Sequence, residues 1–84
     1  MATVRELLDV AVARLRDAGS ETARLDAELL LAFALDVDRT GVIANTDPMV
    51  PNGAAARFTA ALDRRADGEP VAYIRGVLVQ SAAT

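Results

Sequence analysis

An unbroken run of apolar residues, from Leu29 to Leu35, is the feature that most constrains how this chain can fold. The run is too short to cross a bilayer, which needs about 20 apolar residues. It holds no β-branched residue, and leucine and alanine are strong helix formers, so it favours a helix over a strand. A helix that is apolar around most of its circumference must be surrounded by other elements. We therefore predict that Ala23 to Leu35 forms the central helix of a small bundle.

The rest of the chain predicts an all-α fold of four to five helices, in the order long, long, short, long, short. In each stretch the residues favour a helix, and residues that start or stop helices bracket it. The predicted helices are Val4–Ala18, Ala23–Leu35, Arg39–Ala44, Ala54–Ala66 (or from Gly53) and Pro70–Arg75. We expect residues 1–76 to form one helical domain. Residues 77–84 are expected to be a tail, a ragged strand or the start of a linker.

Short polar residues and glycines predict where these helices begin and end. The expected N-caps are Thr3 with Glu6 as a capping box, Ser20 or Thr22, Asp38 and Asn52. The expected stops are Gly19, Asp36, Gly68 and Gly76. On this interpretation Asp36 and Asp38 are caps rather than a pair of catalytic carboxylates. Gly68 to Pro70 could form a binding loop, but a turn that stops one helix and starts the next is favoured.

The composition excludes several classes of site. The chain has no cysteine and no histidine, which removes disulfides, thiol nucleophiles, Cys/His zinc sites and imidazole bases. A net charge of −3 disfavours nucleic-acid binding. Glu6 and Asp9 interrupt any apolar signal segment. We expect a soluble cytoplasmic protein with no membrane contact. The three aromatic residues, Phe33, Phe58 and Tyr73, are each expected to fill the core, Phe33 above all.

Four charged residues are candidates for a role beyond solubility. Arg57 and Arg64 are seven residues apart, so they share one face of a helix and could contact an acidic protein or ribosomal RNA. The alternative is an ordinary solvated face, and RNA binding would also want exposed aromatic residues. Asp26 and Arg65 fall on apolar stripes of neighbouring helices and predict a partly buried ion pair. The alternative for these two is that both reach solvent at helix ends.

Three stretches, taken in order, resemble a known family. They are ARLDAELLLA from Ala23, DRT from Asp38 and RRADGEPVAYIRG from Arg64 to Gly76, after an AGS turn that follows the first helix. Together they resemble the N-terminal domain of the HemK-type methyltransferases, which methylate the glutamine N5 of peptide chain release factors. The likeness covers roughly Val4 to Gly76, and its most specific part is the pattern RRxxGEPxAYIxG.

The resemblance implies a helical bundle in front of a catalytic domain that binds S-adenosylmethionine. The glycine-rich cofactor loop and the Asn-Pro-Pro-Tyr motif of that catalytic domain are not in this sequence. We therefore expect no catalytic, cofactor-binding or metal-binding residue in this chain. The expected partners are a release factor and the protein's own catalytic domain, with this chain positioning the substrate. The alternative is a stand-alone helical protein-interaction module derived from such an enzyme.

Overall fold

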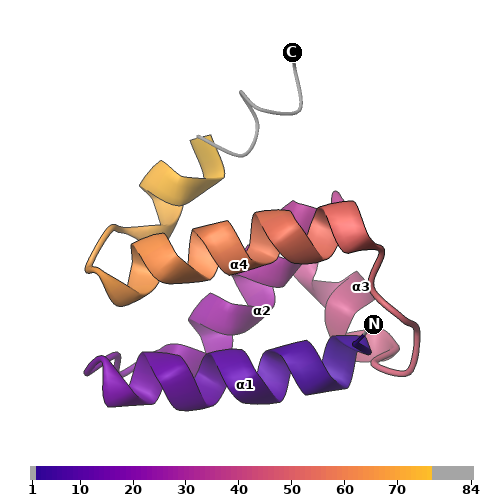
Figure 1. Cartoon of the computed structure of the whole chain (residues 1–84), viewed down its shortest axis with the longest axis horizontal. Coiled ribbons are helices and arrows are strands. Elements are labelled where there is room, and N and C mark those ends of the chain that lie inside the picture. Colours follow the sequence, from indigo (N-terminus) through magenta and orange to yellow (C-terminus); the bar gives the residue numbers. More distant parts are fainter. Residues whose placement is uncertain (1, 77–84) are drawn as a thin grey trace.

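The computed structural model describes residues 2–76, and within them it confirms the predicted all-α bundle. The helices are α1 (Val4–Asp17), α2 (Ala23–Leu35), α3 (Arg39–Ala44) and α4 (Asn52–Ala66), followed by a short helix over residues 71–76 (Figure 1). Their order of lengths is the predicted one. Residues 77–84, for which a tail or linker is predicted, lie outside the described residues.

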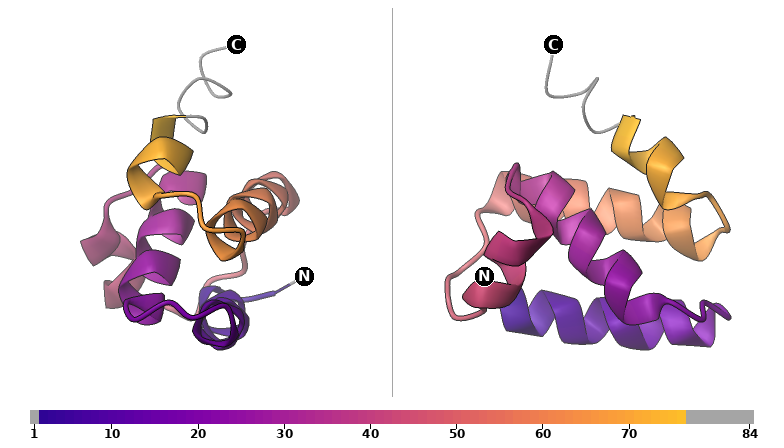
Figure 2. Two further views of the ribbon diagram at one scale, coloured as in Figure 1. Left: turned by 90° about the vertical axis from the view of Figure 1, so that its left-hand side faces the viewer. Right: turned by 180° about the vertical axis from the view of Figure 1, so that it is seen from behind.

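The helix α2 is the centre of the bundle, as the apolar run predicts. It contacts each of α1, α3 and α4. In Figure 1, α1 and α4 run side by side in the same direction, and α2 crosses between and behind them in the opposite sense. The view from behind in Figure 2 shows α2 and α3 covering that face. The short helix 71–76 rises beyond the end of α4 (Figure 2), and Arg75 on it lies over the ring of Phe33 of α2.

The first helix begins where the sequence predicts. Thr3 Oγ1 accepts a hydrogen bond from the Glu6 backbone N–H at 3.2 Å, and Glu6 Oε1 accepts one from the Thr3 N–H at 3.2 Å, so the capping box is confirmed. The N–H of Val4 donates to Pro48 O at 3.0 Å. The loop between α3 and α4 thus satisfies a helix donor that has no partner within α1, and ties this loop to the start of the chain.

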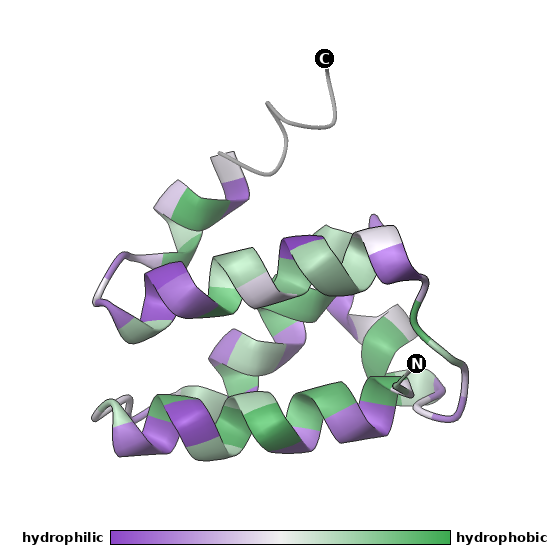
Figure 3. Cartoon of the chain, in the orientation of Figure 1, coloured by the Kyte–Doolittle hydropathy of each residue, from purple (hydrophilic) through white to green (hydrophobic). Residues whose placement is uncertain are grey.

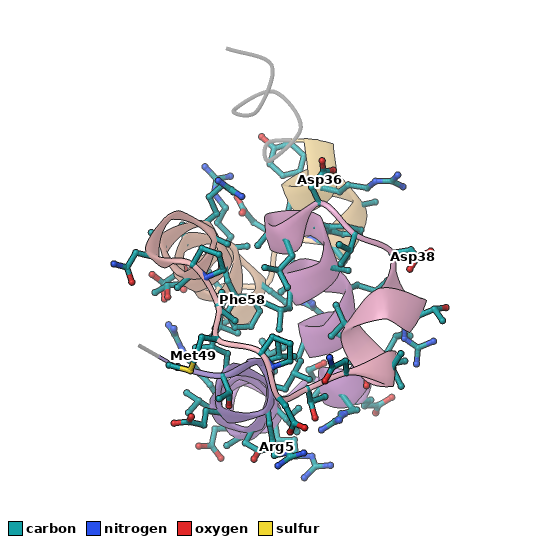
Figure 4. The ribbon with its side chains drawn as sticks, turned by 90° about the vertical axis from the view of Figure 1, so that its right-hand side faces the viewer. Arg5, Asp36, Asp38, Met49 and Phe58 are labelled. Carbon is teal, nitrogen blue, oxygen red and sulfur yellow. The ribbon has the colours of Figure 1, made fainter. Side chains whose placement is uncertain are left out.

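The helix ends also follow the sequence closely. Gly19 and Gly68 have φ of 93° and 103°, the left-handed conformation expected after α1 and α4. Asp36 ends α2 with a φ of 58°. Asp38 Oδ1 accepts from the Gly41 N–H at 2.9 Å and caps α3, which confirms both acidic residues as caps. In Figure 4, Asp36 and Asp38 lie on either side of the turn between these two helices.

One of the two alternative caps predicted for α2 is in place but makes no side-chain cap bond, and the cap predicted for α4 is wrong. Thr22 occupies the capping position of α2, but neither its hydroxyl nor that of Ser20 accepts a hydrogen bond from the helix. Both hydroxyls donate to the Asp26 carboxylate, and these charge-assisted bonds turn the two side chains toward Asp26 rather than toward the N–H groups of α2. Asn52 is the first residue of α4, not its cap, and Pro51 takes the cap position. The fixed φ of proline, here −59°, directs the chain into the helix without a side-chain cap.

The last short helix is displaced by one residue from its prediction. It covers residues 71–76 rather than Pro70–Arg75, so Gly76 is its last residue. Pro70 lies just before it, and its carbonyl accepts from the N–H groups of Tyr73 at 3.1 Å and Ile74 at 3.2 Å. Pro70 therefore supplies the first acceptor of the helix, while its missing N–H costs nothing at this place.

The core differs from the prediction in which aromatic residue fills it. Phe58, which is 2% exposed, points from α4 into the space between α1 and α2 (Figure 4). Phe33 is only partly buried, and Tyr73 is 60% exposed, so the expectation that all three aromatics fill the core is wrong. The sequence shows that α2 is apolar around most of its circumference. It does not show which side of α2 faces the short helix 71–76 instead of the long helices. Phe33 lies on that side.

Leucine and other aliphatic side chains supply the rest of the core. The largest fully buried ones are Leu8, Leu15, Leu30, Leu31, Val42, Val50 and Ile74. In Figure 3 the ribbon of α1 and α4 alternates between hydrophobic and hydrophilic segments, as expected of helices that bury one face. A single core thus receives side chains from each helix of residues 2–76 and, through Val50, from the loop before α4.

Candidate functional site

Two carboxylates are buried in the helix α2, and each joins different elements of the bundle through hydrogen bonds. Asp26 is 6% exposed and Glu28 is 4% exposed, and they are the two buried charged side chains within residues 2–76. A buried carboxylate must be paired and hydrogen-bonded, because moving an unpaired charge out of water costs several kcal/mol. Both have arginine partners in this structure.

Asp26 is brought together with Arg65, the partner that the sequence suggests. Arg65 Nε donates to Asp26 Oδ2 at 3.0 Å. The same oxygen accepts from Ser20 Oγ at 3.0 Å and from Thr22 Oγ1 at 3.1 Å. Because α2 and α4 run in opposite directions, the first turn of one lies beside the last turn of the other. Asp26 therefore joins the α1–α2 loop, α2 and α4 at a single point.

Glu28 forms a second junction that the sequence analysis missed. Arg24 Nε donates to Glu28 Oε2 at 3.0 Å, and Arg39 Nε donates to Glu28 Oε1 at 3.0 Å. The first contact spans one turn of α2, and the second joins α2 to α3. The spacing of four residues between Arg24 and Glu28 could have indicated the first of these contacts, because residues four apart are neighbours on a helix. The contact from Arg39 depends on how α3 folds back, which the sequence pattern does not show.

The two arginines proposed as partner contacts have internal contacts. Arg57 Nη2 donates to the backbone carbonyl of Ala34 near the end of α2. The last carbonyls of a helix receive no hydrogen bond from within that helix, so Arg57 supplies a missing donor. Arg64 Nη1 donates to Glu69 Oε2 at 3.4 Å. The structure therefore does not bring Arg57 and Arg64 to one contact. Both side chains keep substantial exposure beside these bonds.

These arrangements suit a structural role. Each buried carboxylate accepts from two or three donors and has its charge matched by arginine. A general acid or base must exchange a proton with a substrate within hydrogen-bond reach, and lone pairs engaged in this way are poorly placed for that. Within residues 2–76, no cluster of three acidic side chains could hold a metal ion. Among the same residues, no helix is both long and apolar enough to span a bilayer.

The exposed apolar side chains lie on different elements. Among the described residues the large ones are Val10, Leu25, Val37, Ile43, Met49 and Tyr73. They come from α1, α2, the α2–α3 turn, α3, the following loop and the helix 71–76. Single exposed apolar residues are normal on protein surfaces. They do not by themselves mark a binding site.

Residues 6–76 match the family described as the PrmC N-terminal domain. The chain belongs to this family. Similar curated proteins include the release factor glutamine methyltransferase of Moorella thermoacetica, which is 42% identical over 74 residues, covering 88% of this chain and 26% of that protein. The protein of the same name from Bradyrhizobium diazoefficiens is 47% identical over 64 residues, covering 76% of this chain and 22% of that protein.

A third similar protein, the release factor glutamine methyltransferase of Geobacter sulfurreducens, is 43% identical over 75 residues. It too is covered over 26% of its length. The chain thus spans about a quarter of the length of the curated relatives it matches. No solved structure was found to be similar.

The three stretches that resemble the N-terminal domain of the HemK-type methyltransferases are held together by the two buried carboxylates. Asp26 and Glu28 both lie in the stretch that begins at Ala23. Arg39 belongs to the stretch at the start of α3, and Arg65 to the stretch that links α4 to the helix 71–76. The charged residues of these motifs therefore connect the elements of the fold in this member of the family.

Proposed function

We propose that this chain is the substrate-positioning domain of an S-adenosylmethionine-dependent release factor glutamine N5-methyltransferase. The observation that carries the proposal is the match of residues 6–76 to the PrmC N-terminal domain. The relatives that share this domain are named release factor glutamine methyltransferases, and about three quarters of their length lies outside the match. A catalytic domain elsewhere in the protein would then perform the methyl transfer. A cytoplasmic location is part of the same proposal, since release factors act in translation.

The described residues, 2–76, do not themselves fit S-adenosylmethionine. Its adenosine and sulfonium groups need a concave site with convergent polar groups. The two buried carboxylates of the described residues, Asp26 and Glu28, are already bonded to arginines and hydroxyls. Gly19 and Gly68 end helices rather than forming a phosphate- or cofactor-binding loop. In the proposal the cofactor therefore belongs to the catalytic domain, and this domain contributes to holding the release factor.

Arg57 and Arg64 are the candidate contacts for a release factor. They lie on one face of α4 and keep exposed guanidinium surface beside their internal bonds. Arginine is well suited to such contacts, because its planar group can bond a carboxylate or a backbone carbonyl through parallel N–H groups. Their role at an interface stays a proposal.

A stand-alone helical interaction module is the second candidate function. Residues 2–76 contain a single apolar core, and their buried carboxylates are bonded within the same residues. Such a unit could bind a partner protein independently of any enzyme. It would not need to recognise a release factor.

Titrating the purified chain with a peptide chain release factor tests the proposal. Isothermal calorimetry should show saturable binding, and Arg57→Ala or Arg64→Ala should weaken it if these side chains form the contact. Arg16→Ala is the matched control, because Arg16 is an exposed arginine of a different helix, α1. Absence of saturable binding would favour the stand-alone module. Equal binding by all variants would show that the two arginines do not contact the release factor, although the domain still binds it.

A further inference from the structure

The short helix 71–76 is held on the bundle at more than one point. Ile74 is fully buried, and Val71 packs against the core with part of its surface covered. On the same helix, the guanidinium carbon of Arg75 lies 5.4 Å from the centre of the Phe33 ring. A cation within about 6 Å of a ring centre is attracted by the electrons of the ring face. Arg75 therefore contacts the one aromatic ring of α2.

A helix of this length needs such contacts to keep its place. Helices shorter than about 12 residues are marginal in water by themselves. Ile74, together with the partly covered Val71, holds one side of the helix against the core. The stack of Arg75 on Phe33 supplies a second fixed point on a different element. Two points together set the direction of the helix axis.

That direction matters because of where the helix lies. It is the last described element, and Figures 1 and 2 show it pointing away from α4 beyond the turn at Gly68. The matched family is an N-terminal domain, so in the relatives the remaining sequence follows this helix. Whatever follows residue 76 begins from the orientation that this helix adopts.

We propose that Arg75 is a positioning residue: by stacking on Phe33 it fixes the orientation of the helix 71–76 and hence the direction in which the chain leaves the bundle. The significance for catalysis rests on the proposed function, in which a methyltransferase domain follows. Arg75 would then act on the placement of that domain relative to the release factor, not on the methyl transfer itself.

Amide hydrogen exchange measures how firmly the helix is held. The N–H groups of Tyr73 and Ile74 bond to Pro70 O, so their exchange reports the opening of the helix. Arg75→Ala should speed their exchange by about twofold to fivefold, the loss expected for an exposed cation–π contact. Arg75→Lys should restore most of the protection, because lysine keeps the cation. Arg16→Ala, on an exposed face of α1, is the matched control and should change nothing.

Spin-label distances measure the orientation itself. The chain has no cysteine, so cysteines introduced at the exposed positions Val10 and Tyr73 can be labelled without background. The distance distribution between them should be narrow in the parent and broader in Arg75→Gln. It should also broaden in Phe33→Leu, which keeps an apolar side chain but removes the ring, and it should narrow again in Arg75→Lys.

Three results would overturn the proposal. One is equal exchange at Tyr73 and Ile74 in the parent and in Arg75→Ala, and another is an unchanged distance distribution. The third is faster exchange that extends equally to the amides of α1, since this would show a general loss of stability rather than a local one. None of these measurements uses a release factor. Failure of this proposal is therefore distinguishable from failure of the proposed function.

Discussion

Arg65 Nε lies 3.0 Å from Asp26 Oδ2, so the last turn of α4 is tied to the first turn of α2. The pair connects two residues that are 39 positions apart in the sequence. The Asp26 side chain is 8% exposed and that of Arg65 23%. A pair so covered need not be more stable than two apolar residues, but the loss of one partner leaves the other charge buried and unmatched.

We expect Asp26→Ala and Arg65→Ala each to lower the free energy of unfolding by about 2 to 4 kcal/mol. Each single change leaves a charged or polar group without its partner. The double variant should be less unstable than the sum of the two, with a coupling of about 0.5 to 3 kcal/mol. Urea melts of the parent and the three variants measure this cycle.

A milder change keeps this experiment informative if the alanine variants do not fold. A domain of this size has a core that contributes only about 3 to 5 kcal/mol of net stability. Arg65→Lys keeps the positive charge but loses the fixed Nε geometry, so it should give an intermediate loss. Additive losses below about 0.5 kcal/mol for each single variant would show that the pair behaves as a solvated surface pair.

Glu28 should contribute more to stability than either of its arginine partners. Glu28→Ala leaves two guanidinium groups without their acceptor and should cost about 2 to 3 kcal/mol. Arg24 is more than half exposed and pairs within one helix, so Arg24→Ala should cost less than about 1 kcal/mol. Thermal melts followed by circular dichroism compare the two. A larger loss for Arg24→Ala would contradict this assignment.

The all-α fold and the order of its helices could be predicted because the signals are local. Apolar periodicity, the Thr3–Glu6 capping box and the glycines at helix ends act within a few residues of chain. The start of α4 was wrong by one or two residues, because Pro51 directs the chain into the helix without the side-chain bond that defines a usual cap.

The polar contacts were predicted only in part, for a physical reason. The Asp26–Arg65 pair could be suggested because both residues interrupt apolar stripes. The hydroxyls of Ser20 and Thr22 donate to Asp26, and this orients both side chains toward the carboxylate and away from the helix N–H groups that a cap would bind. This orientation depends on the position of the carboxylate in the folded bundle, which no local pattern contains. The contact between Arg39 and Glu28 was missed for the same reason.

The chain alone should not transfer methyl groups. This expectation follows from the absence of a glycine-rich cofactor loop and of an Asn-Pro-Pro-Tyr motif in its sequence. The measurement is incubation of the purified chain with labelled S-adenosylmethionine and a release factor. Incorporation of label should stay at the background of a heat-treated sample. Turnover that follows the chain through successive purification steps would contradict the expectation.

Phe58 and Phe33 should differ sharply when each is shortened. Phe58 is fully enclosed by the core, so Phe58→Ala removes a whole ring and leaves a cavity, at a cost of about 3 to 5 kcal/mol. Phe33 is only partly buried and is covered on one face by Arg75, so its ring loses less apolar contact with the rest of the protein. Phe33→Ala should therefore cost about 1 to 2 kcal/mol, at the lower end for core substitutions.

Circular dichroism melts of the two variants separate these values, and Phe58→Leu, which fills part of the cavity, should fall between them. A loss at Phe33 equal to or greater than that at Phe58 would show that the helix 71–76 covers α2 more completely than its contacts here indicate.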